Sequence, residues 1–174
     1  MTERLRIDVW SDIACPWCYV GKRQLEAALD QFPESQRVQI TWRALELDGS
    51  APKVREPVDS ENAGAKNANE QAMIDRMTGV ARGVGLDFRF DRIRPGNTFD
   101  AHRLLHLAAL RGVQDAVKER FLRGYLTEGE AIGDGSTLIR LSREAGLDAD
   151  EVALVLGSDR YADDVRADEA EANA

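Results

Sequence analysis

The sequence predicts an α/β fold in which two parallel strands, connected by one helix, are followed by a region that is almost entirely helical. Near the N-terminus and again around residue 40, apolar residues alternate with polar ones, which is typical of strands with one buried face. Between these stretches, and along the chain after residue 70, apolar residues recur at helical spacing. Two strands separated by a crossover helix are most simply parallel neighbours with a right-handed connection.

The N-terminal part is predicted to contain a strand, a helix, a second strand and a loop. The first strand covers residues 5–9 and leads into two closely spaced cysteines and a helix that ends before Pro33. The second strand is predicted over residues 38–42. The stretch from Asp48 to Asn69 is polar and contains prolines and glycines, so we expect a loop there.

Helical periodicity returns after this loop and continues toward the end of the chain. The apolar residues mark helices near residues 73–84, 98–110, 113–125, 136–146 and 152–156. Asn97 or Thr98 is expected to cap the second of these, whose apolar arc is wide enough for a central helix. Asp148 and Glu151 form a capping-box pattern. The acidic segment 159–171 is predicted to be a solvated face leading to a frayed end, and no strand is expected after residue 90.

The length and the net charge of the chain limit the number of domains and the kinds of partner that we expect. A chain of 174 residues suggests one domain, at about 150 residues per domain, with a core that needs no disulfides. Its 23 basic and 31 acidic side chains are interleaved and give a net charge of −8, which argues against nucleic acid as a partner. No apolar run is long enough for the core of a signal peptide or for a membrane span, so we expect a cytoplasmic protein without membrane attachment.

The two cysteines form the sequence Cys15-Pro16-Trp17-Cys18, placed between the first strand and the first turn of a helix. The free N–H groups and the dipole of a helix N-terminus stabilise a thiolate, which is the nucleophile in disulfide exchange. We therefore expect Cys15 to attack the substrate, with a lowered pKa, and Cys18 to be the resolving thiol. Pro16 suits the first helical position, and Trp17 offers a flat apolar surface to an unfolded segment of a protein substrate.

Two other interpretations of the cysteines stay open. One is a pair of buried thiols without a chemical role, since free cysteine packs as a small hydrophobe. The other is a zinc site completed by His102 and His106, which lie four residues apart on one predicted helix. Because 83 residues separate Cys18 from His102, far more than in a compact zinc finger, we expect no metal.

Charged residues near the cysteine pair have several interpretations. Asp12 lies three residues before Cys15, where it either tunes the thiol or relays a proton, or caps the loop as aspartates do at turns. Lys22 and Arg23 are expected to be solvated helix charges. Because no basic residue stands between the cysteines, the motif itself holds no cation to stabilise the thiolate. We therefore predict a less oxidising couple than that of a periplasmic oxidase with histidine at that position.

The segment from Ser11 to Lys22, SDIACPWCYVGK, resembles the active-site signature of the DsbA-like thioredoxin-fold oxidoreductases, and specifically of the FrnE subfamily. This group is related to the 2-hydroxychromene-2-carboxylate isomerases and the kappa-class glutathione transferases. Three further segments look like the same group, namely RMT at 76–78, GLDF at 85–88 and NTFDAHRLLH at 97–106. The resemblance covers about residues 4–156.

The resemblance implies a thioredoxin-like fold with a large all-helical insertion. Residues 1–66 would be the N-terminal half of the thioredoxin-like domain, and residues 67–174 the helical insertion with the start of the return helix. Such a fold resumes with a cis-proline loop and further strands, for which this sequence has no match. Pro95 precedes a helix, which favours an ordinary turn. We therefore expect the C-terminal part of the thioredoxin sheet to be absent from this chain.

The resemblance also implies disulfide oxidoreductase or isomerase activity on protein or peptide thiols. Cys15 and Cys18 match the family's nucleophile and resolving thiol, with no cofactor beyond this redox pair and with glutathione as an electron partner. The alternative is a glutathione-linked small-molecule isomerase of the 2-hydroxychromene-2-carboxylate isomerase type, although such enzymes typically carry serine where Cys15 stands. A third class is a non-catalytic binding module with the same fold. The direction of the redox reaction and dimerisation both stay open.

Overall fold

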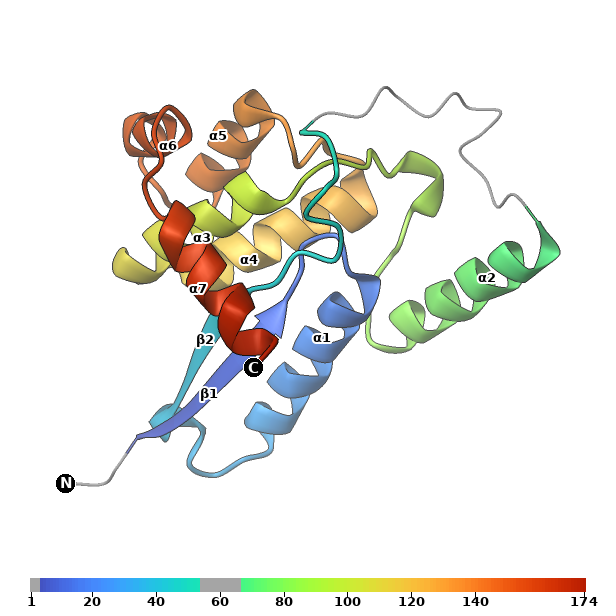
Figure 1. Ribbon diagram of the computed structural model, residues 1–174. Helices are drawn as coiled ribbons and strands as arrows, with labels where there is room; N and C mark the ends of the chain where they lie inside the picture. Colours follow the sequence, from blue (N-terminus) through green and yellow to red (C-terminus); the bar gives the residue numbers. More distant parts are fainter. Residues whose placement is uncertain (1–3, 54–66) are drawn as a thin grey trace.

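The computed structural model describes residues 4–53 and 67–174 of the chain. Within these ranges the main elements are β1 (Leu5–Ser11), α1 (Pro16–Asp30), β2 (Val38–Ala44), α2 (Ala68–Gly83), α3 (Phe99–Leu110), α4 (Gln114–Arg123), α5 (Gly135–Glu144), α6 (Ala149–Leu156) and α7 (Ala162–Ala172). A π-helical turn at Gly124–Glu128 follows α4 directly. Figure 1 shows the two strands with α1 beside them, α3 to α7 gathered around their upper end, and α2 set apart on the far side of α1.

The strands β1 and β2 form a parallel sheet, as the crossover helix between them predicted. The register pairs Leu5 with Val38 and Ser11 with Ala44, so both strands end at the same edge. The cysteine motif follows β1 directly at this edge. In the described part of the chain no strand follows residue 90, which agrees with the prediction, and no helix there is both long and apolar enough to span a membrane.

Side chains from two helices close the free edge of β2. The side chain of Gln114 accepts a hydrogen bond from the backbone N–H of Trp42 (3.0 Å) and donates one to its carbonyl (2.9 Å). Asp168 of α7 accepts a hydrogen bond from the N–H of Ala44 at 2.9 Å. These contacts satisfy backbone groups that an edge strand leaves unpaired, and they attach α4 and α7 to the sheet.

The acidic C-terminal segment is largely the solvated face that its charge pattern predicted, since Asp159, Asp163, Asp164 and Glu171 are exposed. Most of it forms α7, however, and Asp168 of this helix is only 4 % exposed and pairs with Arg43 at 3.1 Å. The backbone carbonyl of Asp168 accepts a hydrogen bond from the indole N–H of Trp10 at 2.8 Å. The prediction missed Asp168 because this acid lies opposite an unpaired N–H of β2 and an arginine of the same strand, a contact that local sequence does not reveal.

The helix α3 is central, as its wide apolar arc predicted, and it packs against α4, α5, α6, α7 and β2. Its buried residues are Ala101, His102, Arg103, Leu104, Leu105, Leu107 and Ala108. The apolar ones join a hydrophobic cluster with residues of α4 to α6, among them Val117, Phe121, Leu138, Leu141 and Val152. The cluster also includes Ile13, Tyr19 and Val20 on either side of the cysteine motif, so this core supports the site directly.

Helix starts follow the predicted capping residues with small differences. The side chain of Asn97, and not that of Thr98, accepts a hydrogen bond from the N–H of Phe99 at the start of α3. Asp148 caps α6 by accepting from the N–H of Glu151 at 2.9 Å.

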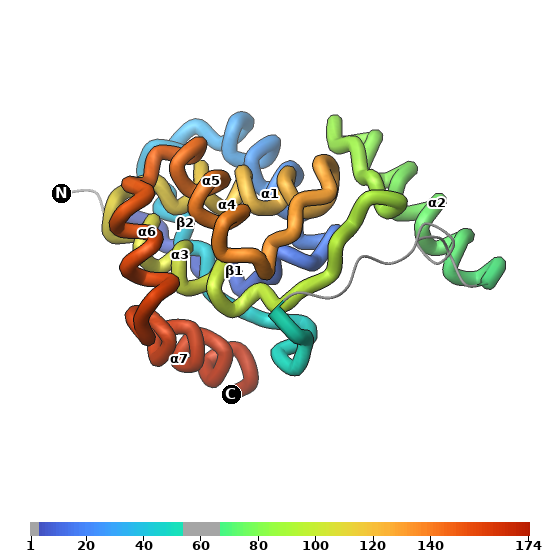
Figure 2. The backbone as a smooth tube through the Cα atoms, turned by 90° about the horizontal axis from the view of Figure 1, so that it is seen from above, coloured from blue at the N-terminus to red at the C-terminus, as the bar shows by residue number. Residues whose placement is uncertain are grey.

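The predicted loop ends two residues early, at the start of α2. There Asn67 caps the helix by accepting from the N–H of Glu70, and Ala68 is already helical. Residues 54–66 of that predicted loop lie outside the described residues. Figures 1 and 2 place α2 at the end of the molecule opposite α6.

Candidate active site

The cysteine pair lies where β1 ends and α1 begins. Cys15 is the N-cap residue of α1, with extended backbone angles, and Pro16 is the first residue of the helix. The Sγ atom of Cys15 accepts a hydrogen bond from the backbone N–H of Cys18 at 3.3 Å. Both residues are free, half-buried thiols. The first sulfur therefore faces the unpaired amides of a helix N-terminus, which favour negative charge.

The two thiols are electrostatically unequal. A hydrogen bond from the Cys18 thiol is the main cause that lowers the pKa of Cys15 to about 7, and the backbone amides of Cys18 and Trp17 contribute further. Burial and the charge of Asp12 oppose this shift. The same hydrogen bond, together with burial, raises the pKa of Cys18. Near neutral pH about half of Cys15 is therefore thiolate, while Cys18 stays a protonated thiol.

The motif combines rigid flanks with one exposed aromatic side chain. Ile13, Tyr19 and Val20 are each at most 2 % exposed and anchor the motif on both sides. Trp17, by contrast, is 51 % exposed, although it lies within the motif. An exposed indole next to a reactive sulfur provides apolar contact area for a polypeptide substrate.

Asp12 braces the loops that follow the two strands. Its carboxylate is 2 % exposed and accepts hydrogen bonds from the N–H groups of Ile13 (2.6 Å) and Leu47 (2.8 Å). The ring Nε2 of His102 on α3 lies 3.3 Å from the same carboxylate. Burial raises the pKa of Asp12, but the hydrogen bond and charge of His102, with further hydrogen bonds from Leu47 and Thr98, outweigh it and lower the pKa to about 2. Asp12 therefore caps the loop, and its charge also raises the pKa of Cys15.

The two histidines contact different carboxylates. His102 is fully buried beside Asp12, and burial lowers its pKa. The Nε2 atom of His106 lies 3.1 Å from Asp168. Within residues 4–53 and 67–174, no group of three or more His, Cys, Asp or Glu side chains is arranged to hold a metal ion. The described residues therefore offer no ligand set for the zinc interpretation.

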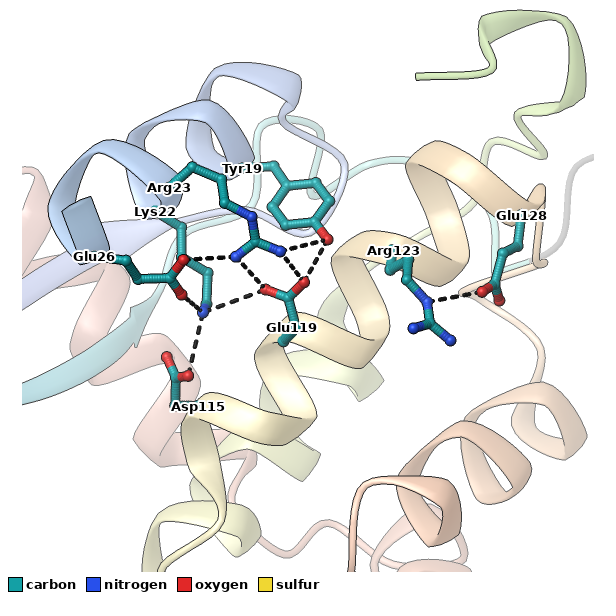
Figure 3. A network of polar contacts seen from close by, with 8 residues as sticks. All are labelled: Tyr19, Lys22, Arg23, Glu26, Asp115, Glu119, Arg123 and Glu128. Atoms are coloured by element: carbon teal, nitrogen blue, oxygen red, sulfur yellow. Dashed lines mark hydrogen bonds and ion pairs between the residues drawn. The ribbon is translucent and has the colours of Figure 1, made fainter. Parts of the chain in front are cut away.

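Lys22 and Arg23 are not the solvated helix charges that local sequence predicted. The side chain of Lys22 is 1 % exposed and lies 3.1 Å from Asp115 and 3.3 Å from Glu119, both on α4. Figure 3 shows the whole network, here called the α1–α4 clamp, which consists of Tyr19, Lys22, Arg23, Glu26, Asp115 and Glu119. Packing of α4 on this face of α1 buries Lys22, while Asp115 stays 64% exposed, and the ion pairs of the clamp connect the helix that carries the cysteines to α4.

One charged residue of the site, Lys118 on α4, was not predicted from the sequence. Its side chain is fully buried, and its Nζ donates a hydrogen bond to the carbonyl of Ser11 at 3.0 Å. Burial lowers the pKa of Lys118 to about 8, and interactions with Cys18, Asp12 and Cys15 oppose this shift. Position 118 lies between Val117 and Phe121 on the buried side of α4. A lysine within that apolar stripe was the available signal.

A Cys-x-x-Cys motif at the start of a helix, directly after a strand of a parallel sheet, defines the redox-site class of thioredoxin-like proteins. The comparison with protein families agrees with this class. The family described as DSBA-like thioredoxin domain matches residues 6–174, so the chain belongs to that family.

Three solved structures are similar to this chain. A probable DsbA oxidoreductase from Streptomyces coelicolor is 41% identical, with a TM-score of 0.87, covering 98% of this chain and 75% of that protein. The cytosolic disulfide reductase DsbM from Pseudomonas aeruginosa, solved with glutathione, is 21% identical, with a TM-score of 0.62 and coverages of 96% and 77%. A 2-hydroxychromene-2-carboxylate isomerase is 16% identical, with a TM-score of 0.63 and coverages of 97% and 79%. The last two similarities concern the fold alone.

The pH dependence of alkylation tests the inequality of the two thiols. The rate at which iodoacetamide modifies Cys15 is expected to rise with a midpoint near pH 7, because the thiolate is the reacting species. Cys18 is expected to stay unreactive in that range, since its pKa is raised. Because the pKa of Cys15 is lowered on folding, the reduced protein should gain stability as the pH rises from 7 to 9. Mass spectrometry locates the adduct, and a Cys15 midpoint near the ordinary value of about 8.5 would contradict the assignment.

Proposed function

We propose that this chain is a thiol-disulfide oxidoreductase or disulfide isomerase that acts on protein or peptide thiols through Cys15 and Cys18. The observation that carries the proposal is the placement of the pair, in which Cys15 caps α1 and its Sγ accepts a hydrogen bond from the backbone N–H of Cys18 at 3.3 Å. This placement agrees with the lowered pKa of Cys15 and the raised pKa of Cys18. Membership of the DsbA-like family supports it, as does the 41% identity to a probable DsbA oxidoreductase.

Two exchange steps follow from this geometry. In the reducing direction, the Cys15 thiolate attacks one sulfur of the substrate disulfide, and the other substrate sulfur leaves and takes a proton from water. Cys18 then gives up its proton and attacks the Sγ of Cys15. The bond between Cys15 and the substrate breaks, and the second substrate sulfur leaves as a thiol. Two electrons have passed from the cysteine pair, now a disulfide, to the substrate, and the reverse sequence oxidises a dithiol.

The site favours polypeptide substrates and a thiol as electron partner. Trp17 is half-exposed beside Cys15, so an extended chain can rest on its ring while the disulfide reacts. Glutathione would return the oxidised pair to the dithiol by the same exchange chemistry, and the structure of DsbM with glutathione motivates this assignment. A cytoplasmic location would keep the pair reduced and direct the net reaction toward reduction or isomerisation.

The alternative is a glutathione-linked small-molecule isomerase. The shared fold of the 2-hydroxychromene-2-carboxylate isomerase is the observation in its favour. Two features favour disulfide exchange instead. The lowered pKa of Cys15 provides the thiolate that attacks a disulfide, and an isomerase of that type does not need Cys18 as a resolving thiol. Turnover of a chromene-type substrate by a Cys15→Ser variant would support the alternative, whereas loss of insulin reduction in that variant supports disulfide exchange.

A redox titration tests the proposed function. Equilibration in glutathione buffers, followed by thiol labelling and mass measurement, is expected to show one two-electron transition between dithiol and disulfide. We expect its potential to be clearly more negative than the value of about −120 mV typical of a strong oxidase. A potential at that oxidising extreme would refute the expected direction of the reaction. A pair that never forms the disulfide across the whole range of buffers would refute the proposed function itself.

A further inference from the structure

A buried lysine without a carboxylate partner lies at the end of β1, just before the cysteine motif. Lys118 enters from α4, and its Nζ reaches the carbonyl of Ser11, the last residue of β1. No carboxylate of the described residues lies within ion-pair distance of this ammonium. Lys22 differs, since it is equally far from the Trp42 ring centroid, 5.8 Å, yet pairs with three carboxylates of the α1–α4 clamp. A buried ammonium without a carboxylate partner lowers the stability of the fold. A functional role would explain why a lysine occupies this position.

The charge of Lys118 acts on the thiol that must lose a proton. Among the interactions that raise the pKa of Lys118, the one with Cys18 is the largest. Reciprocally, the backbone amide of Asp12 and the charge of Lys118 lower the pKa of Cys18. In a mixed disulfide, Cys15 is no longer a thiolate, so its hydrogen bond and its negative charge no longer hold the proton on Cys18. Burial then opposes ionisation of Cys18, and the charge of Lys118 favours it.

Asp12 is poorly suited to take the proton from Cys18. Its carboxylate already accepts hydrogen bonds from the N–H groups of Ile13 and Leu47, and it lies beside His102. Against the effect of burial, His102 and, to a smaller extent, Leu47 lower the pKa of Asp12 to about 2, so it is a weak base toward a thiol. Because Asp12 is a poor base, Cys18 is activated by a charge that stabilises its thiolate and not by proton transfer to a neighbouring carboxylate.

We infer that Lys118 is a positioning residue that activates Cys18, because its buried ammonium stabilises the Cys18 thiolate as it forms and speeds release of the substrate from Cys15. The inference rests on the proposed function. In the accelerated step, the bond between Cys15 and the substrate sulfur breaks and the Cys15–Cys18 bond forms. The proton of Cys18 ends on the departing substrate thiol, so atoms and electrons balance. The α1–α4 clamp keeps α4, and with it Lys118, in fixed relation to α1.

Rapid-quench kinetics with oxidised glutathione test this role. Reduced protein is mixed with oxidised glutathione, quenched with acid, and analysed by intact mass for the adduct at Cys15. Lys118→Met is expected to make this adduct persist about tenfold longer than in the unmodified protein, because the Cys18 thiolate loses its stabilising charge. Lys118→Arg, which keeps the charge, is expected to restore release to within about threefold. Lys53→Met is the control, since it removes a lysine whose side chain is 71% exposed and pairs with Asp100, and it should leave the adduct lifetime within about twofold.

A second readout does not depend on turnover. In a Cys15→Ser background, the alkylation midpoint of Cys18 is expected to rise by about one pH unit when Lys118 is replaced by methionine. An unchanged adduct lifetime and an unchanged Cys18 midpoint in folded Lys118→Met would overturn the inference. If the unmodified protein forms no glutathione adduct at all, the proposed function fails, and the Cys18 midpoint alone then decides whether Lys118 acts on this thiol.

Discussion

Replacement of Cys15 by serine is expected to reduce disulfide reduction to the uncatalysed rate, a loss of at least about a thousandfold. Cys15 has a pKa of about 7 at the start of α1, so much of it is a thiolate at neutral pH. A serine hydroxyl stays protonated there and is a poor nucleophile toward sulfur. Insulin reduction, followed as precipitation of the released chain, measures the loss.

The matched control for this substitution is Cys18→Ser, which removes a thiol of similar burial three residues along the same helix. This variant should retain the first attack and lose only the release of product. Thermal unfolding of both variants shows whether they remain folded. Retention of more than about a tenth of the activity by folded Cys15→Ser would rule out Cys15 as the nucleophile.

The substitution Asp12→Ala is expected to lower the free energy of unfolding by about 3 kcal/mol, because it leaves two amides, of Ile13 and Leu47, without their acceptor. The ionised carboxylate is itself stabilising, since its pKa is about 2 when folded and 3.8 in the reference state. This share, about 2 kcal/mol, is present above pH 4 and is lost as the pH falls toward 2. Denaturant unfolding at pH 7 measures the change. Asp163→Ala is the control, because that side chain is 98% exposed, and it should change stability by no more than about 0.5 kcal/mol.

The milder variant Asp12→Asn separates bracing of the loop from tuning of the thiol. The negative charge of Asp12 raises the pKa of Cys15, so its removal should move the alkylation midpoint of Cys15 below pH 7. The couple should then become more oxidising, since a more stable thiolate favours the reduced form. An unmoved midpoint would mean that Asp12 braces the loop without tuning Cys15.

The N-terminal part of the fold was predictable because its information is local. Alternation over residues 5–9 and 38–42 marked both strands, and the helical period after Cys18 marked the crossover. The Cys-x-x-Cys spacing at a strand-to-helix junction placed both thiols at the N-terminus of α1 without any knowledge of tertiary contacts. The central position of α3 followed in the same way from the width of its apolar arc.

The surroundings of the thiols were not predictable because they come from distant parts of the chain. His102 reaches Asp12 across 90 positions, and Lys118 reaches Ser11 across 107. Lys22 looked like an ordinary surface charge until α4 was placed over it. The absence of a basic residue within the motif suggested a site with no cation. In the structure, however, α4 contributes the buried ammonium of Lys118 at the end of β1. Only packing of the helical region on the strands reveals which charges share the site.

In the proposed mechanism, Cys15 attacks the substrate disulfide and Cys18 resolves the mixed disulfide. The most direct test incubates reduced Cys15→Ser and Cys18→Ser variants with a peptide that carries one intramolecular disulfide, and measures the covalent peptide adduct by intact mass. We expect an adduct approaching one peptide per chain on Cys18→Ser, attached to Cys15, and almost none on Cys15→Ser over the same time. An adduct that forms at least as fast on Cys18 of the Cys15→Ser variant would contradict this mechanism.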